Sequence, residues 1–566
     1  MLTAINIKIG GQAGEGIKTT GLILSKIFAR SGFSIFSYDE YPSLIRGGHN
    51  TYQMYAAPEP VYSQHQLVNV LVALDEQSLS EHQGELDKNS LILYDPNEFQ
   101  PQKLISEKFI AVPWIDLAEK AGGSAIMANM VSLGAICGLT GLSLNPLFNL
   151  IADIFEKKGQ DITKNNQKAA QAGYDFVLKN FAFHKIDLQI PKKIEDKMVL
   201  TGNEMIGLGA VAAGLKYFAA YPMTPASNIL HFLASLAKKY SIIVNHTENE
   251  ISAINTAIGA SAAGVRSMTA TSGGGFSLMT EGLGLAGISE TPLVIVEGMR
   301  PGPASGMPTW TGQGDLLFMI NASQDEFPRI VFTPGSIDEC FSLTKTAFYL
   351  AEKYQLPVIV LVDKYLMESH KSCLFVKKIH KNQRLGFQTT IKGKYQRYKI
   401  TAGGISPRPF LGQKGVACLT NSYEHGEDGL ATEESEVRKK MTDKRMRKIK
   451  ALKQELWAPK IFGNDKSKIS LVGFGSTLGP VLEAIKEVKD INYLHFDYVW
   501  PFPKKAVSNF LKKARKLVCL EGNASGQLAK LITQETGIII ENQFLKYDGR
   551  PFYPEEIIDY LKKLKS

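Results

Sequence analysis

The sequence predicts a multidomain α/β protein. The chain has 566 residues, enough for about three domains at roughly 150 residues each. Short apolar runs that predict strands alternate with segments of helical periodicity, in the order expected of parallel sheets. Glycine- or proline-rich turns follow several of the predicted strands. These turns would gather at the carboxyl ends of the strands, where ligands of parallel α/β sheets bind.

The central stretch, residues 221–300, has the clearest βαβαβ order. It opens with Tyr221-Pro222-Met223-Thr224-Pro225, after a predicted strand that ends near Ala220. We expect Thr224 to be the N-cap of a helix that runs to about Lys239, with Pro225 as its first residue. Such a helix start suits a carboxylate, although an ordinary capped helix has the same pattern.

A second turn of this stretch carries acidic residues. Residues 241–246 predict a buried strand, and Ile251, Ile254 and Ile258 then recur at helical spacing. Glu250 therefore stands at the start of a buried helix, either as a surface cap or as an acid that meets a ligand. Glu248 is the alternative acid.

Two further turns complete the central stretch. A strand at 267–272 leads to a turn at Gly273-Gly274-Gly275 and a helix at 276–287. A strand at 292–297 ends near Arg300, in a loop rich in glycine and proline. A helix at 337–354 and a strand at 357–362 follow.

The N-terminal region begins with a similar strand, turn and helix. A strand at 4–9 runs into Gly10-Gly11-Gln12-Ala13-Gly14-Glu15-Gly16, and a helix follows from about Ile17 to Ser31. This turn lets backbone N–H groups approach a phosphate, but a purely structural tight turn explains the glycines equally well. It matches neither the Rossmann nor the Walker A spacing. The segment Tyr41-Pro42-Ser43-Leu44-Ile45-Arg46-Gly47-Gly48 follows the next predicted strand.

Together these motifs resemble the 2-oxoacid:ferredoxin (acceptor) oxidoreductases. The stretch from Tyr221 onward resembles their α subunit, in the pyrimidine-binding domain for thiamine diphosphate, and residues 1 to about 183 resemble their γ domain. The motifs that carry the likeness are YPMTP at 221–225, TENE at 247–250, TATSGGGFSLMTEGLGLAG at 269–287, MRPGPASGMPT at 299–309 and GGQAGEG at 10–16. YPMTP stands for the family's YPITP, and GGQAGEG departs in order from its GGxGGQG turn.

The resemblance implies oxidative decarboxylation of a 2-oxoacid to acyl-coenzyme A and CO₂, with electrons passed to ferredoxin. Glu250 matches the carboxylate that bonds the aminopyrimidine of thiamine diphosphate. Thr224 and Arg300 match the residues that bind the substrate carboxylate. Gly11, Gly14 and Gly16 would lie near coenzyme A. The sequence does not distinguish 2-oxoglutarate, pyruvate and branched-chain 2-oxoacids, nor does it identify the electron acceptor.

A separate β subunit is expected to complete the enzyme. The chain has no Gly-Asp-Gly, and its only Asn-Asn, at 165–166, has no such partner upstream, so the sequence lacks the usual diphosphate and Mg²⁺ ligands. Its five cysteines form no C-x-x-C, so a [4Fe-4S] cluster would also lie in the partner. We therefore predict no metal site in this chain, and a heterodimer or a dimer of heterodimers.

The domain organisation follows from the resemblance and from composition. We expect a γ-like domain at 1–183, a polar linker at 184–198, the pyrimidine-binding domain at 199–370 and an irregular charged segment at 371–466. A C-terminal α/β domain at 467–566 resembles the transketolase C-terminal domain. In the charged segment, Glu424 and His425 form a metal-like pair, but without a third ligand a structural role is favoured.

The composition limits the possible partners. The net charge of +9 comes largely from basic runs at 377–399 and 438–453, which predict a solvated surface or an acidic protein partner such as ferredoxin. They contain no nucleic-acid module. No membrane span or signal peptide is predicted, so we expect a cytoplasmic protein. Two other functions stay open: a non-oxidative, transketolase-like thiamine enzyme and a non-catalytic nucleotide-binding protein.

Overall fold

The computed structural model describes residues 2–44, 47–101, 108–122, 124–374, 384–388, 394–464 and 466–565. Within these ranges the chain forms two compact units. The first contains residues 1–200, 369–377 and 553–566. The second contains residues 201–368 and 378–552. Part of the basic run at 377–399, and Ile45 and Arg46 of the segment after the second predicted strand, lie outside the described residues.

The first unit is built on an eight-stranded sheet in the order β6-β5-β4-β1-β3-β2-β14-β7. Strand β1 pairs parallel with β4 and antiparallel with β3. The strands are β1 (Ile5–Gln12), β2 (Ser34–Glu40), β3 (His49–Ala57), β4 (Val68–Ala73), β5 (Leu86–Tyr94), β6 (Phe109–Ala111), β7 (Lys197–Thr201) and β14 (His370–Leu374). Strand β14 comes from the segment that we predicted to be irregular.

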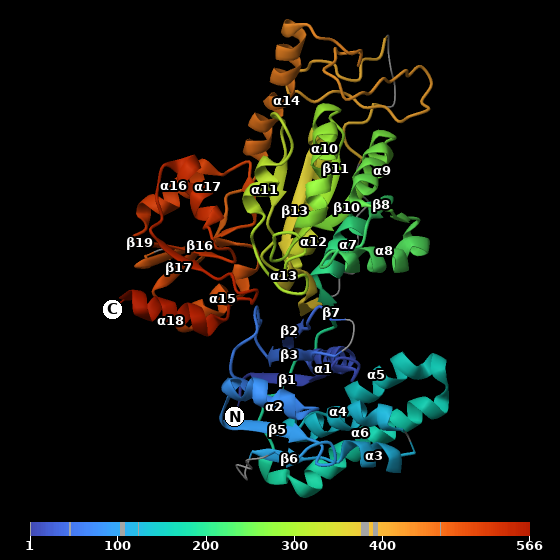
Figure 1. Cartoon of the computed structure of the whole chain (residues 1–566), viewed down its shortest axis with the longest axis vertical. Helices are drawn as coiled ribbons and strands as arrows, with labels where there is room; N and C mark the ends of the chain where they lie inside the picture. Colours follow the sequence, from blue (N-terminus) through green and yellow to red (C-terminus); the bar gives the residue numbers. More distant parts are fainter. Residues whose placement is uncertain are drawn as a thin grey trace. The chain divides into compact units, whose positions relative to one another are not determined.

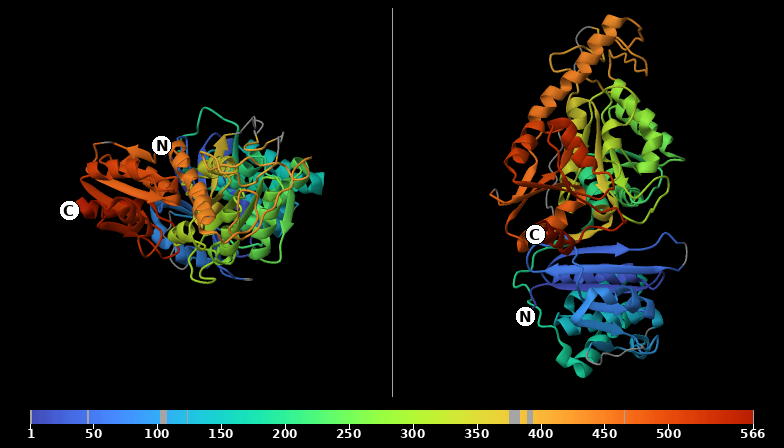
Figure 2. Two further views of the ribbon diagram at one scale, coloured as in Figure 1. Left: turned by 90° about the horizontal axis from the view of Figure 1, so that it is seen from above. Right: turned by 60° about the vertical axis from the view of Figure 1, so that its left-hand side comes forward.

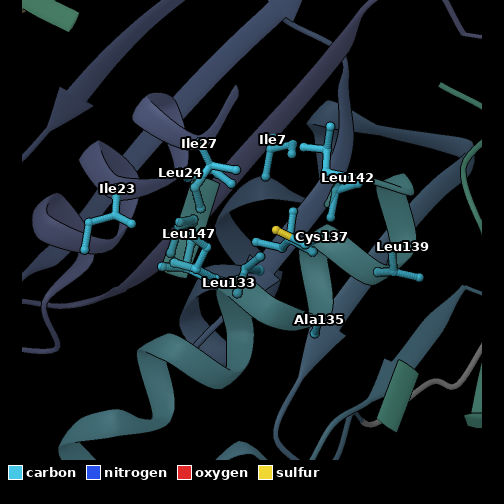
Figure 3. Close-up of a cluster of buried hydrophobic side chains, with 14 of the residues drawn as sticks. Ile7, Ile23, Leu24, Ile27, Leu133, Ala135, Cys137, Leu139, Leu142 and Leu147 are labelled. Atoms are coloured by element: carbon cyan, nitrogen blue, oxygen red, sulfur yellow. The ribbon is translucent and has the colours of Figure 1, made fainter. Parts of the chain in front are cut away.

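Helices cover this sheet and form its core (Figures 1 and 2). They are α1 (Ile17–Arg30), α3 (Trp114–Lys120), α4 (Ala128–Thr140), α5 (Asn145–Phe155) and α6 (Gln160–Asn180). The first unit also contains α2 (Glu76–His82) and α18 (Pro554–Lys565). Figure 3 shows Ile7 of β1 near Ile27 of α1 and Cys137 of α4, all fully buried or nearly so. Helices α4 and α6 cross closely at Gly134, where a Cβ would clash with the backbone carbonyl of Ala170. The absence of a side chain at Gly134 therefore permits this crossing. The predicted strand and helix at the N-terminus are confirmed.

No single described helix is long and apolar enough to cross a membrane. The pair Trp114–Lys120 and Ala125–Thr140, bent by 116°, meets the requirement by length and composition only. Most of α4, which belongs to this pair, is buried in the core of the first unit.

The second unit contains a seven-stranded sheet in the order β18-β12-β13-β11-β10-β8-β9. All neighbours except β12 and β18 are parallel. The strands are β8 (Tyr217–Ala220), β9 (Ile243–His246), β10 (Ser267–Ser272), β11 (Leu293–Met299), β12 (Ile330–Phe332), β13 (Pro357–Asp363) and β18 (Tyr498–Trp500). The predicted βαβαβ order and the parallel sheet are thus confirmed.

Most helices of this sheet connect its strands, whereas α7 (Gly202–Ala212) precedes its first strand and α13 (Lys364–Glu368) follows β13 (Figure 1). The connecting helices are α8 (Ser227–Tyr240), α9 (Glu250–Ala262), α10 (Gly273–Ile288), α11 (Leu316–Asn321) and α12 (Ile337–Tyr354). A five-stranded sheet, in the order β15-β17-β16-β19-β20, completes the unit. It comprises β15 (Lys460–Gly463), β16 (Ile469–Phe474), β17 (Ile491–Phe496), β19 (Lys516–Glu521) and β20 (Asn542–Leu545), with α15 (Leu478–Glu487), α16 (Lys504–Lys513) and α17 (Gln527–Thr536).

Three local predictions were wrong. Helix α8 begins at Ser227, not at Pro225, because the amides of Ala226 and Ser227 both bond the carbonyl of Met223 in a turn that precedes the helix. Gly273-Gly274-Gly275 is the first turn of α10 rather than a separate turn. Strand β9 is at the sheet edge, and Ile243 is 65% exposed instead of buried.

The charged segment was also mispredicted. Residues Ser435–Glu455 form one helix, α14, rather than irregular chain. Its lysines do not all face solvent: Lys444 and Lys448 are fully buried and pair with Glu290. Glu424 bonds Arg438 and Arg445, which agrees with the structural role that we favoured for it.

Candidate functional site

Thr224 and Arg300 meet at the carboxyl edge of the seven-stranded sheet. Strands β8 and β11 both flank β10, so the loops that follow them lie near one another. The Nη1 atom of Arg300 donates to the backbone carbonyl of Thr224 at 2.8 Å. Both residues are half-buried. This bond uses one of the five guanidinium donors and leaves a planar cation that suits a carboxylate.

The loop around Thr224 is held against the core of the unit. A Cβ at Gly298 would lie 2.8 Å from the ring of Pro225, so β11 approaches this loop closely. The side-chain amide of Asn203, on α7, donates to the carbonyl of Pro225 at 3.1 Å. The first turn of α8 has no side-chain cap, but the amides of Ser227 and Ile229 already bond the carbonyls of Met223 and Ala226.

Glu250 is the first residue of α9 and is 3% exposed. The N-cap of α9 is Asn249, whose side chain accepts from the amide of Ser252 at 2.8 Å, so Glu250 is not needed as the cap. The Oε1 atom of Glu250 is buried and has no hydrogen-bond partner among the described residues. A buried carboxyl oxygen of this kind is costly unless a ligand or another chain bonds it.

Gly275 provides the space beside Glu250. A Cβ at Gly275 would lie 2.6 Å from Oε1 of Glu250 and 2.1 Å from Oγ1 of Thr271. The glycine run therefore keeps the first turn of α10 close to this carboxyl group. In the described part of the chain, no hydrogen bond joins Glu250 to Thr224 or Arg300.

Glu248 differs from Glu250 in its surroundings. It lies two residues earlier, and its side chain is exposed at the sheet edge. An exposed carboxylate is solvated and gains little from a buried ligand. Glu250 is therefore the buried acid of this turn, and Glu248 is the exposed one.

Two acids near Arg300 were not predicted from the sequence. Glu297, on β11, is fully buried, and burial together with the neighbouring Asp315 raises its pKa well above the usual range. Burial also raises the pKa of Asp315, while burial lowers the pKa of Arg300. The two carboxyl groups and Arg300 therefore influence one another electrostatically, and both carboxyl oxygens of Glu297 are buried without a hydrogen-bond partner among the described residues. A charged residue inside the apolar run PLVIVEGM was the available signal in the sequence.

The glycine-rich turn of the first unit adopts conformations that favour glycine. Gly14 has a φ of 107° and Gly16, the N-cap of α1, has a φ of 79°. A Cβ at Gly14 would meet nothing within 4 Å, whereas one at Gly11 would clash with the carboxylate of Glu15. Space is therefore left beside Gly14, whereas the side chain of Glu15 occupies the space beside Gly11.

Glu15 occupies part of this turn. Its carboxylate accepts from the amide of Gln12 at 2.7 Å, so one donor that a phosphate could use is taken. Burial raises the pKa of Glu15, the Gln12 bond lowers it, and Asp75 and Glu98 raise it further. The amides at the start of α1 have no side-chain cap and remain suitable for an anion.

Comparison with known proteins decides the family. Residues 6–176 match the family model described as pyruvate ferredoxin/flavodoxin oxidoreductase, and residues 208–444 match its thiamine diphosphate-binding model. The 2-oxoacid:ferredoxin oxidoreductase subunit alpha of Sulfolobus sp. is 32% identical over 98% of this chain and 96% of its own. The chain belongs to the 2-oxoacid:ferredoxin oxidoreductase family.

Within this family the chain is an α subunit that also contains the N-terminal domain matched at residues 6–176. The 2-oxoglutarate synthase subunit KorA of Methanothermobacter marburgensis is 29% identical, over 65% of this chain and 100% of its own. The 2-oxoglutarate:ferredoxin oxidoreductase from Magnetococcus marinus, a structure with 2-oxoglutarate, coenzyme A and succinyl-CoA bound, matches over 100% of both chains, with 31% identity and a TM-score of 0.93. The α-subunit name implies that other subunits complete the enzyme.

Proposed function

We propose that this chain is the γ–α subunit of an enzyme that oxidatively decarboxylates a 2-oxoacid in partnership with a β subunit. The carbon–carbon bond to the carboxylate breaks and releases CO₂, and the acyl group passes to the sulfur of coenzyme A. The thiol gives up its proton, and two electrons pass to two oxidised ferredoxins. The buried, unpartnered Oε1 of Glu250 carries this proposal, because it is placed to receive a ligand.

The residues of the second unit fit thiamine diphosphate in part. When bound, this cofactor supplies a carbon nucleophile that also accepts the electrons of the breaking bond. We assign Glu250 to bond the aminopyrimidine ring, where its carboxyl oxygen would find the partner that it lacks in the chain. The space left by Gly275 allows an approach to that oxygen.

Thr224 and Arg300 are assigned to the substrate carboxylate. The Arg300 side chain is oriented by the carbonyl of Thr224, and its remaining donors can bond both carboxylate oxygens. A charge-assisted contact of this kind contributes about 1.5–3 kcal/mol. The substrates that share this group are 2-oxoglutarate, pyruvate and branched-chain 2-oxoacids.

Coenzyme A is assigned to the glycine-rich turn at Gly11, Gly14 and Gly16. The open side at Gly14 and the uncapped start of α1 support this assignment. The carboxylate of Glu15 opposes it, since it already bonds Gln12 and would repel a phosphate. A phosphate would therefore bind at the start of α1 rather than at the Gln12 amide.

The β subunit is assigned the diphosphate, Mg²⁺ and the [4Fe-4S] cluster. The sequence of this chain lacks the Gly-Asp-Gly pattern, no disulfide joins its five cysteines, and four of them are buried. Among the described residues, the only group of three close ligand side chains contains no cysteine. We further propose a ferredoxin as electron acceptor, an αβ heterodimer or a dimer of these, and a cytoplasmic location.

The domain boundaries also belong to this proposal. We assign a γ-type domain to residues 1–183, a linker to 184–198 and the pyrimidine-binding domain to 199–370. A connecting segment at 371–466 and a transketolase C-terminal-like domain at 467–566 follow. The family match at 6–176 lies within the first assigned domain, whereas the match at 208–444 covers most of the pyrimidine-binding domain and extends into the connecting segment.

The test measures the activity of the chain together with its β subunit. The chain is purified from its native extract with its partner, and viologen reduction is measured with each 2-oxoacid, with and without coenzyme A. We expect reduction that requires one 2-oxoacid and coenzyme A, and that is lost in the Glu250→Gln variant of the assembled enzyme. Turnover without an electron acceptor would instead support a non-oxidative thiamine enzyme.

A further inference from the structure

Two histidines from distant parts of the first unit converge at the edge of its sheet. His49 begins β3 and lies opposite Gln12 of β1, whereas His82 ends α2. Their Nε2 atoms are 2.8 Å apart, and their side chains are only 8% and 9% exposed. Nothing in the proposed function uses them.

A carboxylate completes the group. Oε2 of Glu81 lies 4.0 Å from Nε2 of His49, and one atom from each of the three side chains lies within 4.8 Å of the others. The side chain of Glu81 is 47% exposed, so this side of the group is open to solvent. Two imidazoles and one carboxylate with an open side form a donor set that suits Zn²⁺.

A further carboxylate orients one of these imidazoles. Oε1 of Glu85 lies 3.1 Å from Nδ1 of His82. With the proton on Nδ1, this bond leaves a lone pair on Nε2, directed at the group. Carboxylates bond metal-binding histidines in this way and keep the tautomer that binds the ion.

The local charge also favours a cation. Among the described residues, the buried Lys8 contacts the group: its Nζ lies 3.5 Å from Nδ1 of His82, and its charge is paired with Glu85. Two carboxylates lie beside the histidines, Glu81 at 4.0 Å from Nε2 of His49 and Glu85 at 3.1 Å from Nδ1 of His82. A hydrogen bond between two neutral imidazoles would also explain the 2.8 Å distance, so metal titration has to distinguish the two arrangements.

We propose that His49, His82 and Glu81 bind a Zn²⁺ ion through the two Nε2 atoms and the carboxylate, with water in the remaining position. Tetrahedral binding at about 2.0–2.1 Å from each nitrogen would require the two Nε2 atoms to separate by about half an ångström. The ion would join the start of β3 to the end of α2, next to the strand β1 that leads into the glycine-rich turn. This site goes beyond the proposed function and does not depend on it.

Metal titration of the full chain, stripped with a chelator, tests the proposal. Co²⁺ is used as a spectroscopic probe and Zn²⁺ as its competitor. We expect one Co²⁺ per chain, with an absorption spectrum free of thiolate charge transfer. His82→Gln and Glu81→Gln should weaken binding by about 100-fold and 10-fold, and Glu85→Gln by about 10-fold or more.

Matched controls separate the site from adventitious binding. His231→Gln and Glu76→Gln change an exposed histidine and an exposed glutamate and should leave the affinity unchanged. Glu81 is half-exposed, so its variant tests the site even if His82→Gln does not fold. No Co²⁺ binding by the wild-type chain, equal affinity in the Glu81 variant, or a thiolate spectrum would overturn the proposal.

Discussion

The Nη1 atom of Arg300 donates to the backbone carbonyl of Thr224, 76 positions earlier in the chain, at 2.8 Å. This bond connects the loop after β11 to the loop after β8. It therefore orients the guanidinium group before any substrate binds. An oriented cation loses less conformational entropy when it bonds a carboxylate than a freely rotating one.

The first prediction concerns Arg300. In the assembled enzyme, Arg300→Ala should lower kcat/KM for the 2-oxoacid by about 10- to 100-fold, mainly through KM, since a charge-assisted contact is worth about 1.5–3 kcal/mol. Arg300→Lys should recover only part of the loss, because an ammonium cannot form a forked pair. Steady-state kinetics measure both, with the exposed Arg515→Ala as control. An unchanged kcat/KM would remove Arg300 from the site.

The second prediction distinguishes Glu250 from Glu248. Glu250→Gln should lower kcat by about 10²- to 10⁴-fold, the range for loss of an acid–base group. Glu248→Gln should have little effect, because Glu248 is exposed. Both variants should still assemble with the β subunit, which size-exclusion chromatography would show. If the Glu248 variant lost activity and the Glu250 variant kept it, the assignment would be reversed.

Local patterns predicted the framework of the site. Ile251, Ile254 and Ile258 recur at helical spacing, which correctly placed Glu250 at the start of a helix. The same reasoning failed at Pro225, because proline suits both a first helical position and a turn, and only the bonds to the carbonyl of Met223 distinguish them. Such bonds depend on how the loop packs against β11.

Contacts between distant residues could not be predicted from these patterns. In the sequence, Glu297 looks like a polar residue at the end of a strand. Its burial near Asp315 depends on the order of strands in the sheet. His49 and His82 are separated by 33 positions and show no metal-binding spacing; the packing of α2 next to β1 and β3 brings them together. We predicted no metal site in this chain because it contains no Gly-Asp-Gly and no C-x-x-C.

The third prediction concerns the buried acid Glu297. Its pKa is raised in the folded state, so it stays protonated while the unfolded chain ionises above about pH 4.5. Its effect on stability is therefore fully favourable below that pH and is lost as the pH rises toward the folded pKa. Glu297→Gln, which resembles the protonated acid, should raise the unfolding temperature relative to wild type increasingly from pH 5 to pH 8. A difference that does not change with pH would show that Glu297 is ionised in the folded protein.

The fourth prediction concerns Glu290, which α14 surrounds with positive charge. Burial alone would raise the pKa of Glu290, but Lys448, Lys444 and Arg397 hold it at about 2. Oε2 of Glu290 lies 2.6 Å from Nζ of Lys448, and Lys444 bonds Oε1. Glu290→Gln would leave two buried ammonium groups without their counter-charge. This should cost about 3–5 kcal/mol in the free energy of unfolding near neutral pH.

The lowered pKa of Glu290 determines how its contribution to stability changes with pH. Because the folded pKa lies below the unfolded value, ionised Glu290 stabilises the protein fully above about pH 4.5, and the contribution is lost as the pH falls toward 2. The difference in unfolding temperature between wild type and Glu290→Gln should therefore shrink over that interval. Thermal unfolding followed by circular dichroism measures it, with Glu436→Gln on the exposed face of α14 as control. Equal stability of the Glu290 variant and wild type at pH 7 would show that these charges do not hold α14 in place.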